Sequence, residues 1–566
     1  VAHQNGQRGI DVAIRDADIA EIDLENLQAD GNQAAGVFVE TADTEISLVA
    51  VRDATADENA GAGLDLLQTG SFLAVAAVSG IQANDNGGAG IRVAQTNNAI
   101  GLANVSGSTA NDNAGAGVFL DQDSILASIG IVGMPEGFAA TADALATLLD
   151  LELPEEIDPF LGPFGAVTAN GNGARGVQSL VRTDGVLALG GIFDVAASNN
   201  AAGGVYSLNE ATNGIAAGLA GSSENLAEVF ELGTNVAALF DLDLPLSLAG
   251  GGHMQVNGNA GPGFEMHTLG DQAAVSAIVG LETVGNAGAG AVVETDSDYL
   301  SLAAIARLVS TGNAGNGLQM DVVGTDYAGF GLLADIDASG NGANGIAADI
   351  ESQNGMAALL ALSTDALRPA AALLGEGYFG EAIEVPGEPF GPVLASGNAG
   401  DGFHATVTGY DIAVAAFLDV QANDNGGTGF DVATASADGM AISAFLSTDV
   451  VYDVLPDVLG GDPIAYDPLG GVAANGNGTN GFRIDMDGSD RSILVMAGAE
   501  ANDNVAGDGL YANLDSADGA VDAYLVNVAA NDNAAGRGID LDLDSEEESR
   551  AGLVFVNADG NGQQGI

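Results

Sequence analysis

A short glycine motif recurs along the whole chain and constrains the fold more than any other feature of the sequence. It has the form N-x-x-x-G-apolar, as in Asn86–Ile91, Asn113–Val118 and Asn341–Ile346. Its glycine stands at positions 9, 36, 63, 90, 117, 176, 204, 263, 290, 317, 345, 402, 429, 481, 509, 538 and 565. Twelve of the sixteen intervals share nearly one length, about 27 residues, which is typical of a protein built from stacked repeats.

Each repeat has the pattern of short strands separated by turns. The motif glycine is followed by alternating apolar residues, as in Val37–Val39, and a second alternating run comes later, as in Ile46–Val51. Alternation between corners rich in Gly, Asn and Asp indicates strands, and no 3.6-residue period is present. We therefore expect an all-β parallel β-solenoid of about 17 coils of about 27 residues, forming one continuous domain over residues 1–566. A large apolar residue follows the glycine in sixteen of the seventeen copies, which predicts an inward-facing column.

The asparagine of the motif predicts a hydrogen-bonded ladder. Equivalent residues of neighbouring coils stack about 4.8 Å apart, and stacked Asn amides bond to one another. Asn and Gly also tolerate the left-handed backbone conformation that a tight corner needs. The expected ladder consists of Asn5, Asn32, Asn59, Asn86, Asn113, Asn172, Asn200, Asn259, Asn286, Asn313, Asn341, Asn398, Asn425, Asn477, Asn504, Asn533 and Asn561.

With this motif and ladder, the chain resembles the right-handed parallel β-helix proteins of the pectate-lyase-like superfold. Within that group it is most similar to repetitive bacterial surface and fibre proteins. The resemblance implies a right-handed coil. It specifies the fold better than the function, because the superfold also includes polysaccharide lyases, hydrolases and phage tailspikes.

Four long intervals contain insertions, near residues 130–166, 218–254, 363–392 and 447–470, and we expect them to project from one corner. They hold twelve of the 13 prolines, and parts of them have helical periodicity. Their aromatic residues form either small satellite cores or a protein contact surface. These aromatic residues are Phe138, Phe160, Phe164, Phe240, Tyr378, Phe379, Phe390, Tyr452 and Tyr466.

The charge of the chain excludes several classes of protein. It has 78 acidic and 12 basic side chains, giving a formal net charge of −66, and it has no Cys. Nucleic acid is therefore an implausible partner, and disulfides or Cys-based metal sites are impossible. An apolar content of 47% excludes a disordered acidic tail, and no apolar run reaches membrane-spanning length. The acidic, Cys-free composition favours an extracellular or cell-surface location.

Asn-Asp-Asn triplets suggest calcium sites. They occur five times, centred on Asp85, Asp112, Asp424, Asp503 and Asp532. In successive coils these carboxylates would lie about 5 Å apart, which is unfavourable without a cation, and oxygen ligands suit Ca²⁺. The alternative is that they are solvated corner residues, and we expect no other cofactor.

Two further patterns involve basic residues. The position two after the motif glycine places Arg92 one coil from Asp65, which predicts a surface ion pair. The four histidines, His3, His253, His267 and His404, are scattered and show no metal-ligand spacing.

The function that these features favour is structural. We expect a subunit or segment of an extracellular fibre, filament or adhesin that associates end to end with copies of itself, because both chain ends fall within the motif without a polar cap. No catalytic residues are assigned. The alternative is a carbohydrate-active β-helix enzyme or a polysaccharide-binding module, with polysaccharide or cell-surface components as partners.

Overall fold

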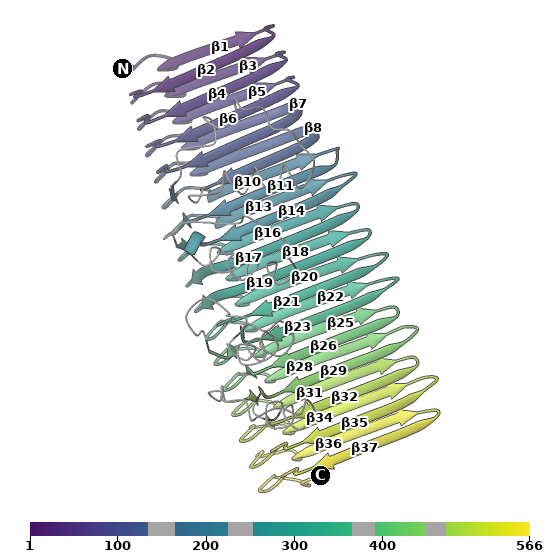
Figure 1. Ribbon diagram of the computed structural model, residues 1–566. Coiled ribbons are helices and arrows are strands. Elements are labelled where there is room, and N and C mark those ends of the chain that lie inside the picture. Colours follow the sequence, from purple (N-terminus) through teal and green to yellow (C-terminus); the bar gives the residue numbers. More distant parts are fainter. Residues whose placement is uncertain (134–164, 225–252, 365–390, 449, 451–470) are drawn as a thin grey trace, which may run out of the picture. The chain divides into compact units, whose positions relative to one another are not determined.

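The computed structural model describes residues 1–133, 165–224, 253–364, 391–448, 450 and 471–566. They form a parallel β-solenoid of about 16 turns with almost no helix, which confirms the predicted fold class (Figure 1). Seventeen motif copies were expected to give about 17 coils, but seventeen glycines delimit only sixteen complete intervals. The chain divides into two compact units, Val1–Gly288 and Ala289–Ile566, so a single continuous domain stays a prediction.

In the first unit, equivalent strands of successive coils stack in parallel into two sheets. The first contains β1 (Ile10–Arg15), β3 (Val37–Ala42), β5 (Leu64–Thr69), β10 (Arg175–Thr183), β13 (Gly203–Ala211) and β16 (Phe264–Gly270). The second contains β2 (Ile19–Glu25), β4 (Ile46–Arg52), β6 (Leu73–Ser79), β11 (Leu187–Phe193), β14 (Ile215–Gly221) and β17 (Ala273–Val284). The two sheets are joined by β7 (Ile91–Ser106) and β8 (Val118–Val132), which continue from one into the other. Short strands close the coils: β9 (Val167–Thr168), β12 (Val195–Ala196) and β15 (Met254–Gln255).

The second unit repeats this arrangement. Its first sheet contains β18 (Ala291–Ser297), β20 (Leu318–Gly324), β22 (Ile346–Ser352), β25 (Phe403–Gly409), β28 (Phe430–Ser436), β31 (Phe482–Gly488), β34 (Leu510–Ser516) and β36 (Ile539–Ser545). Its second sheet contains β19 (Leu300–Thr311), β21 (Ala328–Ala334), β23 (Met356–Leu362), β26 (Ile412–Leu418), β29 (Met440–Leu446), β32 (Arg491–Ala497), β35 (Ala520–Val526) and β37 (Glu548–Val554). The short strands are β24 (Val393–Leu394), β27 (Val420–Gln421), β30 (Val472–Ala473) and β33 (Ala499–Glu500).

The strand register follows the motif. Ile10 pairs with Val37, and Phe403 pairs with Phe430, so residues at the same motif position lie opposite each other. The predicted inward column after the motif glycine is present, although Ile10 is only partly buried and Ile566 is 65% exposed. The other fifteen members are at most 1% exposed. They are Val37, Leu64, Ile91, Val118, Val177, Val205, Phe264, Ala291, Leu318, Ile346, Phe403, Phe430, Phe482, Leu510 and Ile539.

The predicted asparagine ladder runs through each unit. From Asn5 to Asn286, each Nδ2 donates to the Oδ1 of the next ladder residue at 2.9–3.1 Å. The backbone N–H of each residue donates to the same Oδ1. The ladder resumes from Asn313 to Asn561 in the second unit. There Asn477 keeps only its backbone bond to Asn504, at 2.9 Å, and its Nδ2 has no partner among the described residues.

The left-handed corner residue is not the one that the sequence suggested. In all seventeen copies it immediately precedes the ladder asparagine, whereas the ladder asparagines and the motif glycines are not left-handed. Nine of these corner residues are glycine, and the others are Gln4, Glu58, Asn199 and the five aspartates of the Asn-Asp-Asn triplets. The motif glycine is needed for a different reason, because a Cβ at Gly36 would lie 2.6 Å from the Nδ2 of Asn59.

The insertions follow β8, β14, β23 and β29, which are all strands of a second sheet or end in one. The nine aromatic residues predicted to form satellite cores or a contact surface lie outside the described residues, as does most of each insertion. At the entries to three insertions, residues 223–224, 364, 448 and 450 are helical. Over the part of the chain that the structure describes, no helix has the length and apolar character to cross a membrane.

Candidate metal-binding cluster

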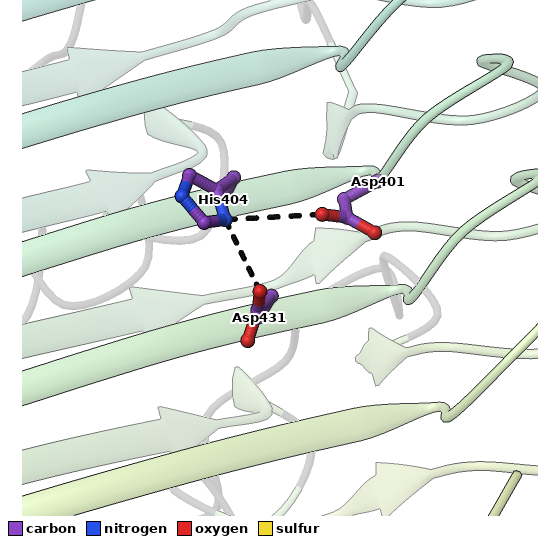
Figure 2. A group of neighbouring side chains, drawn as sticks. All are labelled: Asp401, His404 and Asp431. Atoms are coloured by element: carbon purple, nitrogen blue, oxygen red, sulfur yellow. Dashed lines mark hydrogen bonds and ion pairs between the residues drawn. The ribbon is translucent and has the colours of Figure 1, made fainter.

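Asp401, His404 and Asp431 form a cluster on the outer surface of the second unit (Figure 2). Among the described residues, this is the one group of three or more carboxylate or imidazole side chains whose ligand atoms all lie within 4.8 Å of one another. His404 and Asp431 lie directly opposite each other on β25 and β28. Asp401 lies at the corner that leads into β25, so the cluster combines one corner with two strands.

The strands that carry the cluster rest on a column of aromatic rings. Beneath the outer surface, Phe430 stacks between Phe403 and Phe482, with ring centroids 5.4 and 5.0 Å apart. Phe417 and Phe445 of the second sheet meet Phe430 edge-on, at interplanar angles of 73° and 82°. This packing fixes the backbone from which the two outward side chains project.

Two carboxylate oxygens of the cluster lie close to the same imidazole nitrogen. The Nδ1 of His404 lies 3.2 Å from the Oδ2 of Asp431 and 3.8 Å from the Oδ2 of Asp401. The other oxygen of Asp401 accepts a 2.6 Å hydrogen bond from the backbone N–H of Thr428. The other oxygen of Asp431 lies 3.6 Å from an Nη atom of Arg483.

The surroundings shift the pKa values of His404 and Asp401. The hydrogen bond with Asp431 raises the pKa of His404, and partial burial of the imidazole opposes that rise. Burial raises the pKa of Asp401, against the effect of the backbone hydrogen bond from Thr428. Protonated His404 therefore forms an ion pair with Asp431, whereas a neutral imidazole with its proton on Nε2 has an Nδ1 lone pair that faces both carboxylates.

The sequence did not reveal this cluster. The four histidines showed no metal-ligand spacing, because the three candidate ligands come from two different coils. The available signal was the spacing between His404 and Asp431, which equals one repeat and places them in register. The spacing does not place Asp401 beside them, because that contact depends on the geometry of the corner.

The five aspartates predicted to bind calcium lie elsewhere. Asp85, Asp112, Asp424, Asp503 and Asp532 are exposed corner residues with positive φ, and none belongs to the cluster. Their left-handed conformation accounts for Asp at a position that glycine otherwise occupies. Calcium binding at these positions stays a prediction.

The asparagine before each of these aspartates has a structural role that the sequence analysis missed. The backbone N–H of Asn111 donates to Asn84 Oδ1 at 2.9 Å, and that of Asn170 donates to Asn111 Oδ1 at 2.8 Å. This second ladder runs in the opposite direction to the first, since each N–H points to the preceding coil. Both asparagines of an Asn-Asp-Asn triplet therefore hold the corner.

Two other surface features are resolved. The predicted ion pair between Arg92 and Asp65 is confirmed at 2.8 Å.

A shallow depression of about 240 Å³ lies over the first sheet of the second unit. It is lined by residues from β28, β31 and β34, namely Ala433, Thr434, Ala435, Asp485, Met486, Asp487, Asn513 and Asp515.

Comparison with known proteins found no family model, no curated protein and no solved structure that matches this chain. The likeness to the pectate-lyase-like superfold therefore rests on the sequence motif and the ladder.

Proposed function

We propose that this chain is a structural segment of an extracellular fibre, filament or adhesin that associates with copies of itself, built on a right-handed β-helix of the pectate-lyase-like kind. The asparagine ladder carries the proposal. The Nδ2 of Asn59 donates to Asn86 Oδ1 at 3.1 Å and to Ala29 O at 3.0 Å. Its Oδ1 accepts two bonds from Asn32 at 2.9 Å. A buried amide satisfied by both neighbouring coils resists separation of the coils along the axis.

The second unit also has an outer surface suited to self-association, which we call the apolar face. It consists of the uncharged residues at the outward positions of five second-sheet strands, of which Ala328, Ala334 and Leu362 are themselves buried. Its residues are Leu300, Leu302, Ala304, Ala306, Ala328, Phe330, Leu332, Ala334, Met356, Ala358, Leu360, Leu362, Ile412, Val414, Ala416, Leu418, Met440, Ile442, Ala444 and Leu446. Arg307, on β19 directly after Ala306, lies at the border of this face.

Charge is concentrated on the first sheet of the same coils. The outward residues there include Glu294, Asp296, Asp321, Asp349 and Glu351. Two copies that meet through their apolar faces bring uncharged surfaces together and keep these carboxylates in water. The distribution therefore supports lateral pairing, in addition to the end-to-end association expected from the repeat. An extracellular location and calcium at the corner aspartates belong to the same proposal, and the acidic composition supports them.

Electron microscopy and sedimentation of the purified chain test this function. Filaments or concentration-dependent oligomers are expected, and added salt should promote them by screening the charge. Ile442→Glu places a carboxylate on the apolar face and should weaken lateral association. Ala433→Glu adds the same charge to the first sheet of the same coil and should not. Discrete monomers at every concentration and salt level would rule the proposal out.

A polysaccharide-binding module is the second candidate, and a pair of exposed tyrosines favours it. Tyr299 and Tyr327 lie at the same corner of adjacent coils and are 53% and 58% exposed. Their rings stack 5.1 Å apart with an interplanar angle of 11°. Exposed aromatic faces beside polar groups form a surface on which a sugar ring can stack.

Binding to a panel of neutral and acidic polysaccharides tests this second candidate. Tyr327→Ala should weaken any such binding, whereas Tyr524→Ala, which removes a tyrosine from the second sheet, should not. Equal binding by both variants, or no binding by the natural chain, argues against it. Release of sugar products from the same panel would instead indicate an enzyme.

A further inference from the structure

The ligand chemistry of the cluster selects a class of cation. Asp401, His404 and Asp431 offer one imidazole nitrogen and two carboxylate oxygens. Calcium and magnesium prefer oxygen ligands alone, whereas an imidazole beside carboxylates suits zinc and related transition metals. The calcium predicted for the corner aspartates is therefore not the cation that fits here.

The cluster is held in place before any cation binds. The backbone N–H of Asp401 donates to Asn344 Oδ1 at 2.9 Å, and its Oδ1 accepts from Thr428, so only its Oδ2 remains directed at His404. Asp431 is held in a similar way, since its Oδ1 faces Arg483 while its Oδ2 faces the imidazole. Outer contacts of this kind orient ligands in metal sites and reduce the cost of ordering them.

The solvent exposure of His404 and the nearby negative charge also favour binding of a cation. The side chain of His404 is 49% exposed, which leaves room for water molecules to complete a coordination shell. Asp349 on the preceding coil interacts electrostatically with His404 and adds another carboxylate to the surroundings. The opposing charge is Arg483, which competes for Asp431.

We propose that Asp401 Oδ2, His404 Nδ1 and Asp431 Oδ2 bind one divalent transition-metal cation of the zinc class. The cation would join the corner before β25 to the outer surface of β28 in the next coil. This site goes beyond the proposed structural function and does not depend on it, because a monomeric chain would have the same three ligands.

Isothermal titration of the full chain with ZnCl₂ tests the proposal, after calcium is added in excess to occupy all-oxygen sites. One saturable zinc site is expected. His404→Ala and Asp401→Asn should each weaken it by more than about tenfold. Arg483→Gln should tighten it, because it removes the cation that competes for Asp431.

His3→Ala is the matched control. His3 also faces a carboxylate, with its Nδ1 3.5 Å from Asp30 Oδ2, but it belongs to no group of three ligands in the described residues. Its removal should leave the zinc affinity unchanged. Circular dichroism should show all variants folded, since His404 is a surface residue. Zinc binding that His404→Ala does not weaken, or the absence of a saturable site, would overturn the proposal.

Discussion

At the scale of single residues, three consecutive positions build each corner. In Asn84–Asp85–Asn86, the first residue accepts a bond from the backbone of the next coil, and the second is left-handed. The third belongs to the buried ladder. The composition of the triplet follows from these roles. The first position can supply an amide or a carboxylate oxygen, as Asp57 does for the backbone N–H of Asn84. The middle position favours Gly, Asn and Asp, and the third is Asn in every copy.

Asn86→Ala should destabilise the solenoid by about 3 kcal/mol, because it leaves the buried backbone N–H of Asn59 without an acceptor. It also removes one of the two acceptors of Asn59 Nδ2, which keeps its bond to Ala29 O. Urea unfolding followed by circular dichroism measures the effect. Gln178→Ala, an outward substitution on β10, should change stability by less than about 0.5 kcal/mol and serves as the control. An equal effect of the two substitutions would show that the ladder bond contributes nothing net.

Substitutions at Asp85 separate its conformational role from a cation-binding role. Asp85→Gly should change stability by less than about 1 kcal/mol, whereas Asp85→Val should cost about 1–2 kcal/mol, because a β-branched residue resists positive φ. If calcium binds here, adding it should raise the Tm of the natural chain by more than that of the Asp85→Gly, Asp112→Gly double variant, which keeps the other three aspartates. An identical calcium response of both proteins would exclude these two aspartates as ligands.

At the scale of strands, register decides which residues meet. The alternating pattern predicted apolar inward columns, yet the interior of the first unit also contains Gln68, Gln95 and Gln122, all fully buried. Their amides bond to one another at 2.7 and 2.6 Å. The second-sheet half of β8 makes room for Gln122 with glycine, since a Cβ at Gly130 would lie 2.3 Å from Gln122 Oε1. Polar interior residues are thus tolerated where they stack on their own kind.

The phenylalanine column beneath the cluster gives a prediction at this scale. Phe430→Ala should cost about 4 kcal/mol, because it opens a cavity between four other rings in a fully buried position. Thermal unfolding measures the loss. Phe72→Ala removes the same side chain from a position that is 59% exposed, and it should have little effect. Similar losses for both variants would contradict a tightly packed core.

At the scale of the whole molecule, the net charge of −66 acts against the compact state through self-repulsion. In individual carboxylates, neighbouring negative charge adds to the effect of burial on the pKa. Burial, followed by the neighbouring charge of Asp30, raises the pKa of Asp57 above its ordinary value of 3.8. Burial and the neighbouring Asp298 likewise raise the pKa of Asp296.

The direction of these shifts predicts that mild acid stabilises the protein. A carboxyl with a raised folded-state pKa binds its proton more tightly when folded, so its contribution to stability is lost as pH rises through that pKa. The Tm should therefore increase as pH falls from neutral toward the folded-state pKa values of these carboxyls, and added salt should increase it as well. Differential scanning calorimetry checks this, and the Asp57→Asn, Asp296→Asn double variant should show a shallower slope. A Tm that falls over the same acidification would contradict the prediction.

The sequence by itself determined the coil length, the strands, the inward column and the asparagine ladder. Each of these depends on a residue pattern that is contained in one repeat and recurs seventeen times along the chain. Only the tertiary structure decided the register across the insertions and the contacts made at the corners. Asp431 and Arg483 are in register across an interval that contains an insertion, and His404 meets Asp401 through the shape of a corner. The left-handed position and the apolar face depend in the same way on backbone geometry, since they follow from how successive coils stack and not from any one repeat.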